Sequence, residues 1–107
     1  MNVIQTEIEH EFLNECSEDF VGLWSLVRET QERNTSWSSE EIKNNTLFLL
    51  EKLLKEKKIV AGYPNKSEEF VPWKDSPMEI IRKIKFEWDK LGRFPDIGDI
   101  VWFTSLN

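Results

Sequence analysis

The fold is decided in residues 37–63, WSSEEIKNNTLFLLEKLLKEKKIVAGY, where the spacing of the apolar side chains changes. Ser38 and Glu41 lie three residues apart, which is the capping-box pattern that starts a helix. Apolar residues recur at helical spacing through residues 42–54, and the lysines that follow suit the negative end of a helix. Residues 59–63 are typical of a short strand. The stretch therefore predicts a central helix that leads directly into a strand.

A second strand is predicted to return beside the first and complete a β-hairpin. Residues 64–67, Pro-Asn-Lys-Ser, have the composition of a turn, and residues 70–73, Phe-Val-Pro-Trp, suit a strand. Proline lacks the backbone N–H that a sheet interior needs. We therefore expect Pro72 to place this strand at the edge of its sheet.

A later helix and a last strand are predicted beyond the hairpin. Ser76 and Glu79 repeat the capping box, and Pro77 has the backbone angle that the first helical position requires. Gly92 is a plausible end for this helix. Residues 100–104, Ile-Val-Trp-Phe-Thr, form the strongest strand pattern in the chain. We expect this strand to join the hairpin in a three-stranded antiparallel sheet.

Two more helices are predicted before the central one. Residues 3–15 carry apolar side chains four residues apart, and Ser17 is expected to cap a second helix whose buried stripe runs through residues 20–27. Near Asn34 this helix should end. The expected order is α-α-α-β-β-α-β. It describes a single α+β domain over residues 1–107, in which about three N-terminal helices and one later helix pack on the small sheet.

The sequence contains few residues that could perform chemistry. His10 and Cys16 are the single histidine and the single cysteine, and one helix would place them about 120° apart. Zinc, calcium and Gly-rich phosphate motifs are missing. We therefore expect a protein that is not an enzyme and has neither cofactor nor metal. Because the sequence has no apolar run of ~18 residues and no export signal, we also expect a cytoplasmic protein that is not embedded in a membrane.

The whole chain has a net charge of −6, and its negative charge is concentrated in the N-terminal segment. Residues 1–41 hold ten acidic and two basic residues, whereas residues 42–107 hold ten acidic and twelve basic residues. Such a segment attracts basic surfaces, although a plain solvated helical face is an equal alternative. A tryptophan beside it offers an apolar anchor or, alternatively, a hydrophobic staple. The partner-binding residues expected on this basis are Glu11, Glu15, Glu18, Asp19, Glu29, Glu32 and Trp37.

Three short stretches carry a resemblance to a known class of proteins. They are Gly22-Leu23-Trp24, Lys58-Ile59-Val60-Ala61 and Ile100-Val101-Trp102-Phe103. These stretches, which span most of residues 17–104, resemble a family of small bacterial proteins without assigned function. The small size, the acidity and the five tryptophans also make the chain resemble the immunity proteins of bacterial contact-dependent growth inhibition and related toxin systems. The resemblance implies a non-catalytic cytoplasmic protein that binds a cognate basic toxin, often a nuclease, and blocks its active site or substrate groove. These motifs are core residues, so the resemblance assigns no functional residue.

Two other functions remain open from the sequence. Residues 39–73 resemble the second half of a winged-helix domain, in which Lys52, Lys55, Lys57, Lys58 and Lys66 could contact nucleic acid. The acidic N-terminal segment disfavours nucleic acid as the main partner. A regulatory or structural homo-oligomer is the remaining alternative, with an edge strand and an exposed tryptophan as its contact surface.

Overall fold

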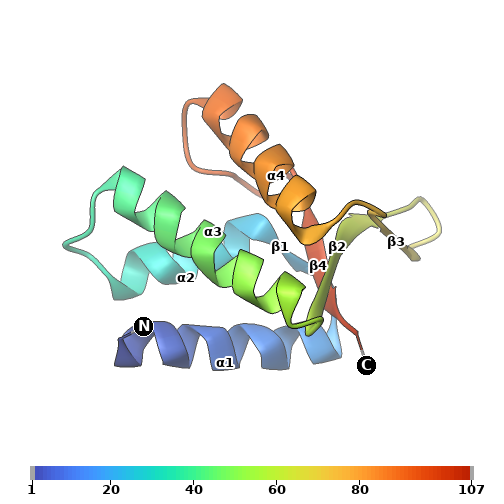
Figure 1. Ribbon diagram of the computed structural model, residues 1–107, viewed down its shortest axis with the longest axis horizontal. Helices are drawn as coiled ribbons and strands as arrows, with labels where there is room; N and C mark the ends of the chain where they lie inside the picture. Colours follow the sequence, from blue (N-terminus) through green and yellow to red (C-terminus); the bar gives the residue numbers. More distant parts are fainter. Residues whose placement is uncertain (1, 107) are drawn as a thin grey trace.

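The computed structural model describes residues 2–106, which fold as α+β, with four helices and a four-stranded antiparallel sheet (Figure 1). The strand order in the sheet is β1-β4-β2-β3. Figure 1 shows α1, α2 and α3 gathered on one side of the strands. The elements in chain order are α1 (Val3–Glu18), β1 (Val21–Gly22), α2 (Leu23–Arg33), α3 (Ser39–Lys55), β2 (Ile59–Pro64), β3 (Phe70–Pro72), α4 (Pro77–Leu91) and β4 (Trp102–Ser105).

The expected α+β class is confirmed, but the three-stranded sheet was wrong. The additional strand is β1, which lies in the stretch that the apolar spacing assigned to a helix. Val21 pairs with Phe103, and Gly22 pairs with Trp102 in β4. Helix α2 begins directly after β1, and the first N–H of this helix, at Leu23, donates to the carbonyl of Val101 at 3.0 Å. The long-range pairing with β4 therefore determines where this helix starts.

The predicted N-cap at Ser17 was also wrong, because the first helix continues through it. The Ser17 hydroxyl donates to the carbonyl of Asn14 at 2.7 Å, within α1. Helix α1 ends at Glu18, and Asp19 is its C-cap. Glu18 and Asp19 consequently lie at the negative end of one helix and not at the positive end of the next. Carboxylates at that end are unfavourable, and the last turn of α1 has no basic residue to balance them.

The local start and stop signals of the two later helices are confirmed. Ser38 accepts from the backbone N–H of Glu41 at 3.1 Å, and the Glu41 carboxylate accepts from the N–H of Ser38 at 3.0 Å. Ser76 begins α4 with the same capping box. Gly92 ends α4 with a φ of 67°, a left-handed conformation that favours glycine. Each of these signals involves residues within one helical turn.

The hydrophobic core lies between the helices and one face of the sheet. Ile59, Ala61 and Phe103 are buried on that face, and the ring of Phe12 from α1 meets that of Phe103 edge-on at 5.8 Å. The opposite face carries Trp102, which is only half-buried. Strand β3 lies at the sheet edge, as expected from Pro72. The sheet thus has one face covered by helices and one face that keeps a tryptophan accessible.

Candidate functional site

The predicted acidic residues of the first two helices meet where α1 and α2 run antiparallel. Arg33, at the end of α2, lies 3.1 Å from Glu7 and 3.6 Å from Glu11, in the first half of α1. At the other end of this contact, Glu15 of α1 lies near Glu29 of α2 across a narrow groove. We call the carboxylates of Glu7, Glu11, Glu15, Glu18 and Glu29 the acidic seam. The packing of α1 against α2 explains why Glu29 shares one surface with carboxylates 11 to 22 residues earlier in the sequence.

A neighbouring cation pairs with three of the five carboxylates of the acidic seam. Arg33 contacts Glu7 and Glu11 and lies 3.9 Å from Glu29. Within residues 2–106, Glu15 and Glu18 form neither an ion pair nor a side-chain hydrogen bond. The end of the seam at the C-terminus of α1 therefore keeps its negative charge uncompensated.

The surroundings of Glu15 shift the pKa of its carboxyl group. Partial burial raises the pKa of Glu15 above its ordinary value of 4.5, and the charges of Glu29, Glu11 and Glu18 raise it further. A nearby like charge disfavours ionisation, whereas a nearby cation would favour it. Burial and the neighbouring carboxylates therefore act together to disfavour the ionised form of Glu15.

The other predicted partner-binding residues are more scattered. Asp19 follows α1, and one of its carboxylate oxygens accepts from the N–H of Phe20 at 2.7 Å. Glu32 is exposed on α2 and has no ion pair among the described residues. Trp37 follows α2 at the end of the helix pair opposite to Glu18, and it packs partly buried against the core. The structure brings the seam and Asp19 together but places Trp37 apart from them.

A cavity that the sequence reasoning missed adjoins the uncompensated end of the seam. It has a volume of about 300 Å³. Three aromatic side chains, three carboxylates and part of β1 and α2 form its walls: Glu15, Glu18, Asp19, Phe20, Val21, Gly22, Trp24, Ser25 and Trp102. We call this cavity the aromatic slot. Trp24, which lies within the stripe expected to be buried over residues 20–27, is only half-buried, as is Trp102.

Gly22 allows the two indole rings to approach β1. A Cβ atom at this position would lie 2.6 Å from Cδ1 of Trp24 and 3.5 Å from Cε3 of Trp102. In the sheet register, Trp102 lies between Gly22 of β1 and Gly62 of β2. The sequence signal for the slot was therefore a glycine two residues before a tryptophan, but its meaning depends on the pairing with β4.

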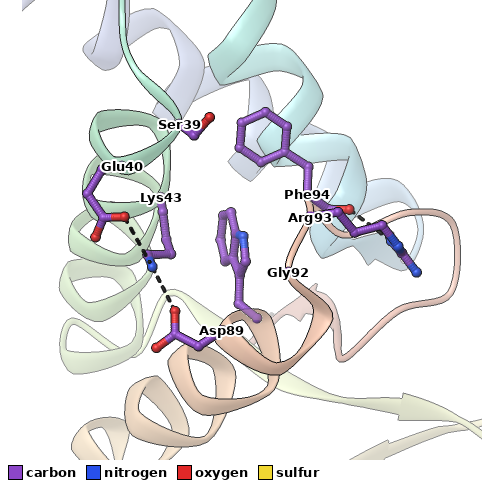
Figure 2. Close-up of a pocket in the computed structure, with 8 residues that line it drawn as sticks. Ser39, Glu40, Lys43, Asp89, Gly92, Arg93 and Phe94 are labelled. Atoms are coloured by element: carbon purple, nitrogen blue, oxygen red, sulfur yellow. Dashed lines mark hydrogen bonds and ion pairs between the residues drawn. The ribbon is translucent and has the colours of Figure 1, made fainter.

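A second cavity, of about 400 Å³, lies between the start of α3 and the end of α4 (Figure 2). Figure 2 shows the Lys43 amine between two carboxylates, at 2.7 Å from Asp89 and 3.4 Å from Glu40. The hydrogen bond with Asp89 raises the pKa of Lys43, and the same bond lowers the pKa of Asp89. Both groups stay charged near neutral pH, which suits an ion pair that joins two helices and not proton transfer.

The remaining reactive groups are poorly placed for chemistry. Cys16 is buried, and burial raises the pKa of its thiol to about 12, with a smaller contribution from Glu15. A thiol with so high a pKa is a weak nucleophile at neutral pH. Among the described side chains, no group of three or more His, Cys, Asp or Glu is arranged to hold a metal ion. The acidic seam and the aromatic slot are therefore the strongest candidate site.

The lysines considered for nucleic-acid contact are largely engaged within the chain. Lys52, Lys55 and Lys58 each lie 3.4 Å or less from a carboxylate. Of the five, Lys57 and Lys66 have no ion pair in the part of the chain that the structure describes. These ion pairs reduce the positive potential that phosphate binding needs.

No helix within residues 2–106 is both long enough and apolar enough to cross a membrane. Comparisons of the chain with protein-family models, with curated proteins and with solved structures found no match.

Proposed function

We propose that this chain is a non-catalytic inhibitor of the immunity class, which binds a basic protein toxin through the acidic surface of α1 and α2. Bound in this way, the chain would cover the active site or substrate groove of the toxin. The observation that carries the proposal is the uncompensated end of the acidic seam. There Glu15 and Glu18 lie beside Glu11 and Glu29 without an ion pair of their own among the described residues.

The energetics of the seam favour a cationic partner. Like charges one turn apart on a helix, such as Glu11 and Glu15, destabilise that helix by ~0.2–0.5 kcal/mol per pair. Glu18 adds a further unfavourable interaction with the negative end of α1. A basic surface that docks on the seam would relieve both effects. The same charges would accelerate association by long-range attraction.

A toxin that acts on nucleic acid fits this surface best. A nuclease needs a cationic groove to hold phosphates, and an acidic protein can occupy that groove in place of the substrate. The inhibitor would act in the cytoplasm, where such a toxin meets its substrate. Direct binding of nucleic acid by this chain is disfavoured, since Lys52, Lys55 and Lys58 are already paired with carboxylates.

Growth rescue tests the proposal directly. The products of the reading frames that adjoin this gene are expressed one at a time in a bacterial host, with and without the chain. We expect one basic product to arrest growth and the chain to restore it, and the two purified proteins to form a complex. If no adjoining product is both basic and neutralised by the chain, the proposal is rejected.

Charge reversal then tests which surface binds. We expect Glu11→Lys, Glu15→Lys and Glu18→Lys together to slow association with the toxin at least tenfold in stopped-flow measurements. The matched control reverses three exposed acidic residues outside α1 and α2, namely Glu68, Glu69 and Asp75. It changes the net charge equally and should have a much smaller effect. Equal slowing by both variants would mean that total charge, and not the seam, controls association.

The salt dependence of the parent protein gives an independent check. Association should slow markedly between about 50 mM and about 500 mM NaCl, because attraction between exposed charges is screened beyond the Debye length. A rate that does not change with salt would contradict an electrostatically guided encounter.

A further inference from the structure

The aromatic slot has the dimensions of a site for one long side chain. Its volume of about 300 Å³ lies at the lower limit of small-molecule pockets. Three of its walls are the aromatic side chains of Phe20, Trp24 and Trp102. Because Trp102 is only half-buried, the slot is open to a partner. Tryptophan is one of the residue types enriched among those that dominate the binding energy of protein interfaces.

The aromatic walls suit a cation. The face of an indole ring attracts ammonium and guanidinium groups. Trp24 already carries such a contact, since the guanidinium carbon of Arg28 lies 4.9 Å from its ring centroid. Arg28 itself is not among the residues that form the slot. The Trp102 ring has no cation over it within residues 2–106.

The polar walls supply matching negative charge. Glu15 and Glu18 have no ion pair in the described part of the chain, and Asp19 has one carboxylate oxygen free of its hydrogen bond with Phe20. All three lie at the carbonyl end of α1, whose dipole adds to their potential. Burial raises the pKa of Glu15, and the further rise caused by Glu29, Glu11 and Glu18 agrees with a site in which carboxylates outnumber cations.

We infer that the aromatic slot binds an arginine side chain of the basic partner, with the guanidinium between the indole of Trp102 and the carboxylates of Glu15 and Glu18. Arginine fits better than lysine because its planar group can stack on a ring and donate to a carboxylate at the same time. The partner's identity as a toxin rests on the proposed function. The chemistry of the slot does not. An arginine seated there would anchor the complex, while the rest of the seam guides the encounter.

A small-molecule titration tests the slot on the intact chain. The probe is N-acetyl-arginine amide, and its control is N-acetyl-citrulline amide, which has nearly the same shape without the charge. We expect the arginine probe to shift the indole N–H signals of Trp24 and Trp102 and the amide signal of Gly22 in a saturable manner. The citrulline probe should bind at least tenfold more weakly. Equal binding of both probes, or shifts elsewhere only, would refute the inference.

Two double variants test which carboxylates bind the arginine probe. Glu15→Gln with Glu18→Gln should weaken binding of the arginine probe at least tenfold. Glu68→Gln with Glu69→Gln removes the same charge from the β2-β3 turn and should leave binding within about twofold. Amide spectra confirm that both variants are folded. If the two double variants bind the probe equally, the carboxylates of the slot are not its ligands and the inference fails.

The outcomes separate this inference from the proposed function. If the arginine probe binds the slot but no basic toxin is neutralised, the inference stands and the proposed function fails. Conversely, a toxin could bind a folded Trp102→Leu variant with the affinity of the parent and still be slowed by reversal of Glu11, Glu15 and Glu18. In that case the seam is the interface and the slot is not its anchor.

Discussion

Replacement of Gly22 by alanine tests how the aromatic slot is built. The backbone of Gly22 has φ −75° and ψ 150°, which any L-residue adopts, so the substitution carries no backbone strain. The new Cβ would lie 2.6 Å from Cδ1 and 2.7 Å from Nε1 of Trp24. Ordinary contacts between carbon atoms are ~3.5–4.0 Å, so the new Cβ and Cδ1 of Trp24 would overlap by ~1 Å. The indole of Trp24 must move away from β1.

The expected loss follows from two opposing effects. Overpacking of this kind typically costs ~1–3 kcal/mol. The lower chain entropy of unfolded alanine returns ~0.4–1 kcal/mol. The free energy of unfolding of Gly22→Ala should therefore fall by ~0–2.6 kcal/mol. Because Trp24 lines the slot, the arginine probe should also bind more weakly.

Two other glycines provide matched controls. At Gly62 the added Cβ would collide with the carbonyl oxygen of Val71 and lie 2.8 Å from Cα of Pro72, which are backbone atoms that cannot turn aside. Gly62→Ala should therefore be the most destabilising of the three. At Gly92 nothing lies within 4 Å, but φ is 67°, so alanine there costs ~1–2 kcal/mol of backbone strain and leaves Trp24 unmoved.

Urea unfolding followed by circular dichroism measures the three free energies, and the indole N–H signal of Trp24 reports its movement. We expect that signal to shift in Gly22→Ala but not in Gly92→Ala. The reasoning would be refuted if Gly22→Ala were as stable as the parent and kept the parent's Trp24 signal.

The remaining predictions concern charge, capping and the buried thiol. Folding raises the pKa of Glu15, so the protonated carboxyl of Glu15 stabilises the folded state relative to the unfolded state. This stabilisation is lost as pH rises through the raised pKa. Glu15→Gln should hence increase the free energy of unfolding at about pH 7, with an advantage that disappears below the ordinary pKa of 4.5; a constant advantage at all pH values would contradict this. Ser38→Ala should lower the free energy of unfolding by ~1 kcal/mol in the same assay, since it removes the hydrogen bond to the N–H of Glu41; no change would show that the cap adds no stability. The Cys16 thiol, with a pKa of about 12, should react with a disulfide reagent only after denaturation; rapid reaction of the folded protein would disprove its burial.

Signals contained within one helical turn were enough to predict half of the fold. The capping boxes at Ser38 and Ser76 and the stop at Gly92 placed both ends of α4 and the start of α3. Their interactions are complete within a few residues, so the sequence alone specifies them. The hairpin was predicted for the same reason, because turn residues lie between two short apolar runs.

Features that depend on distant pairing could not be predicted in this way. The spacing of Phe20, Leu23, Trp24 and Val27 fits a helix, yet pairing with β4 makes Val21–Gly22 a strand. The aromatic slot was missed with β1, because it exists only where Gly22 meets Trp102. The excess of acidic residues was visible by counting. Its partial neutralisation by Arg33 was not, since that depends on how α1 and α2 pack.

The position of β4 has a consequence for biosynthesis. This strand lies between β1 and β2 in the sheet, yet a ribosome makes it after every other element described above. While β4 is still inside the exit tunnel, β1 has no hydrogen-bonding neighbour, and β2 of the hairpin lacks the strand on its other side. The sheet of the nascent polypeptide therefore cannot close before Trp102–Ser105 has left the ribosome.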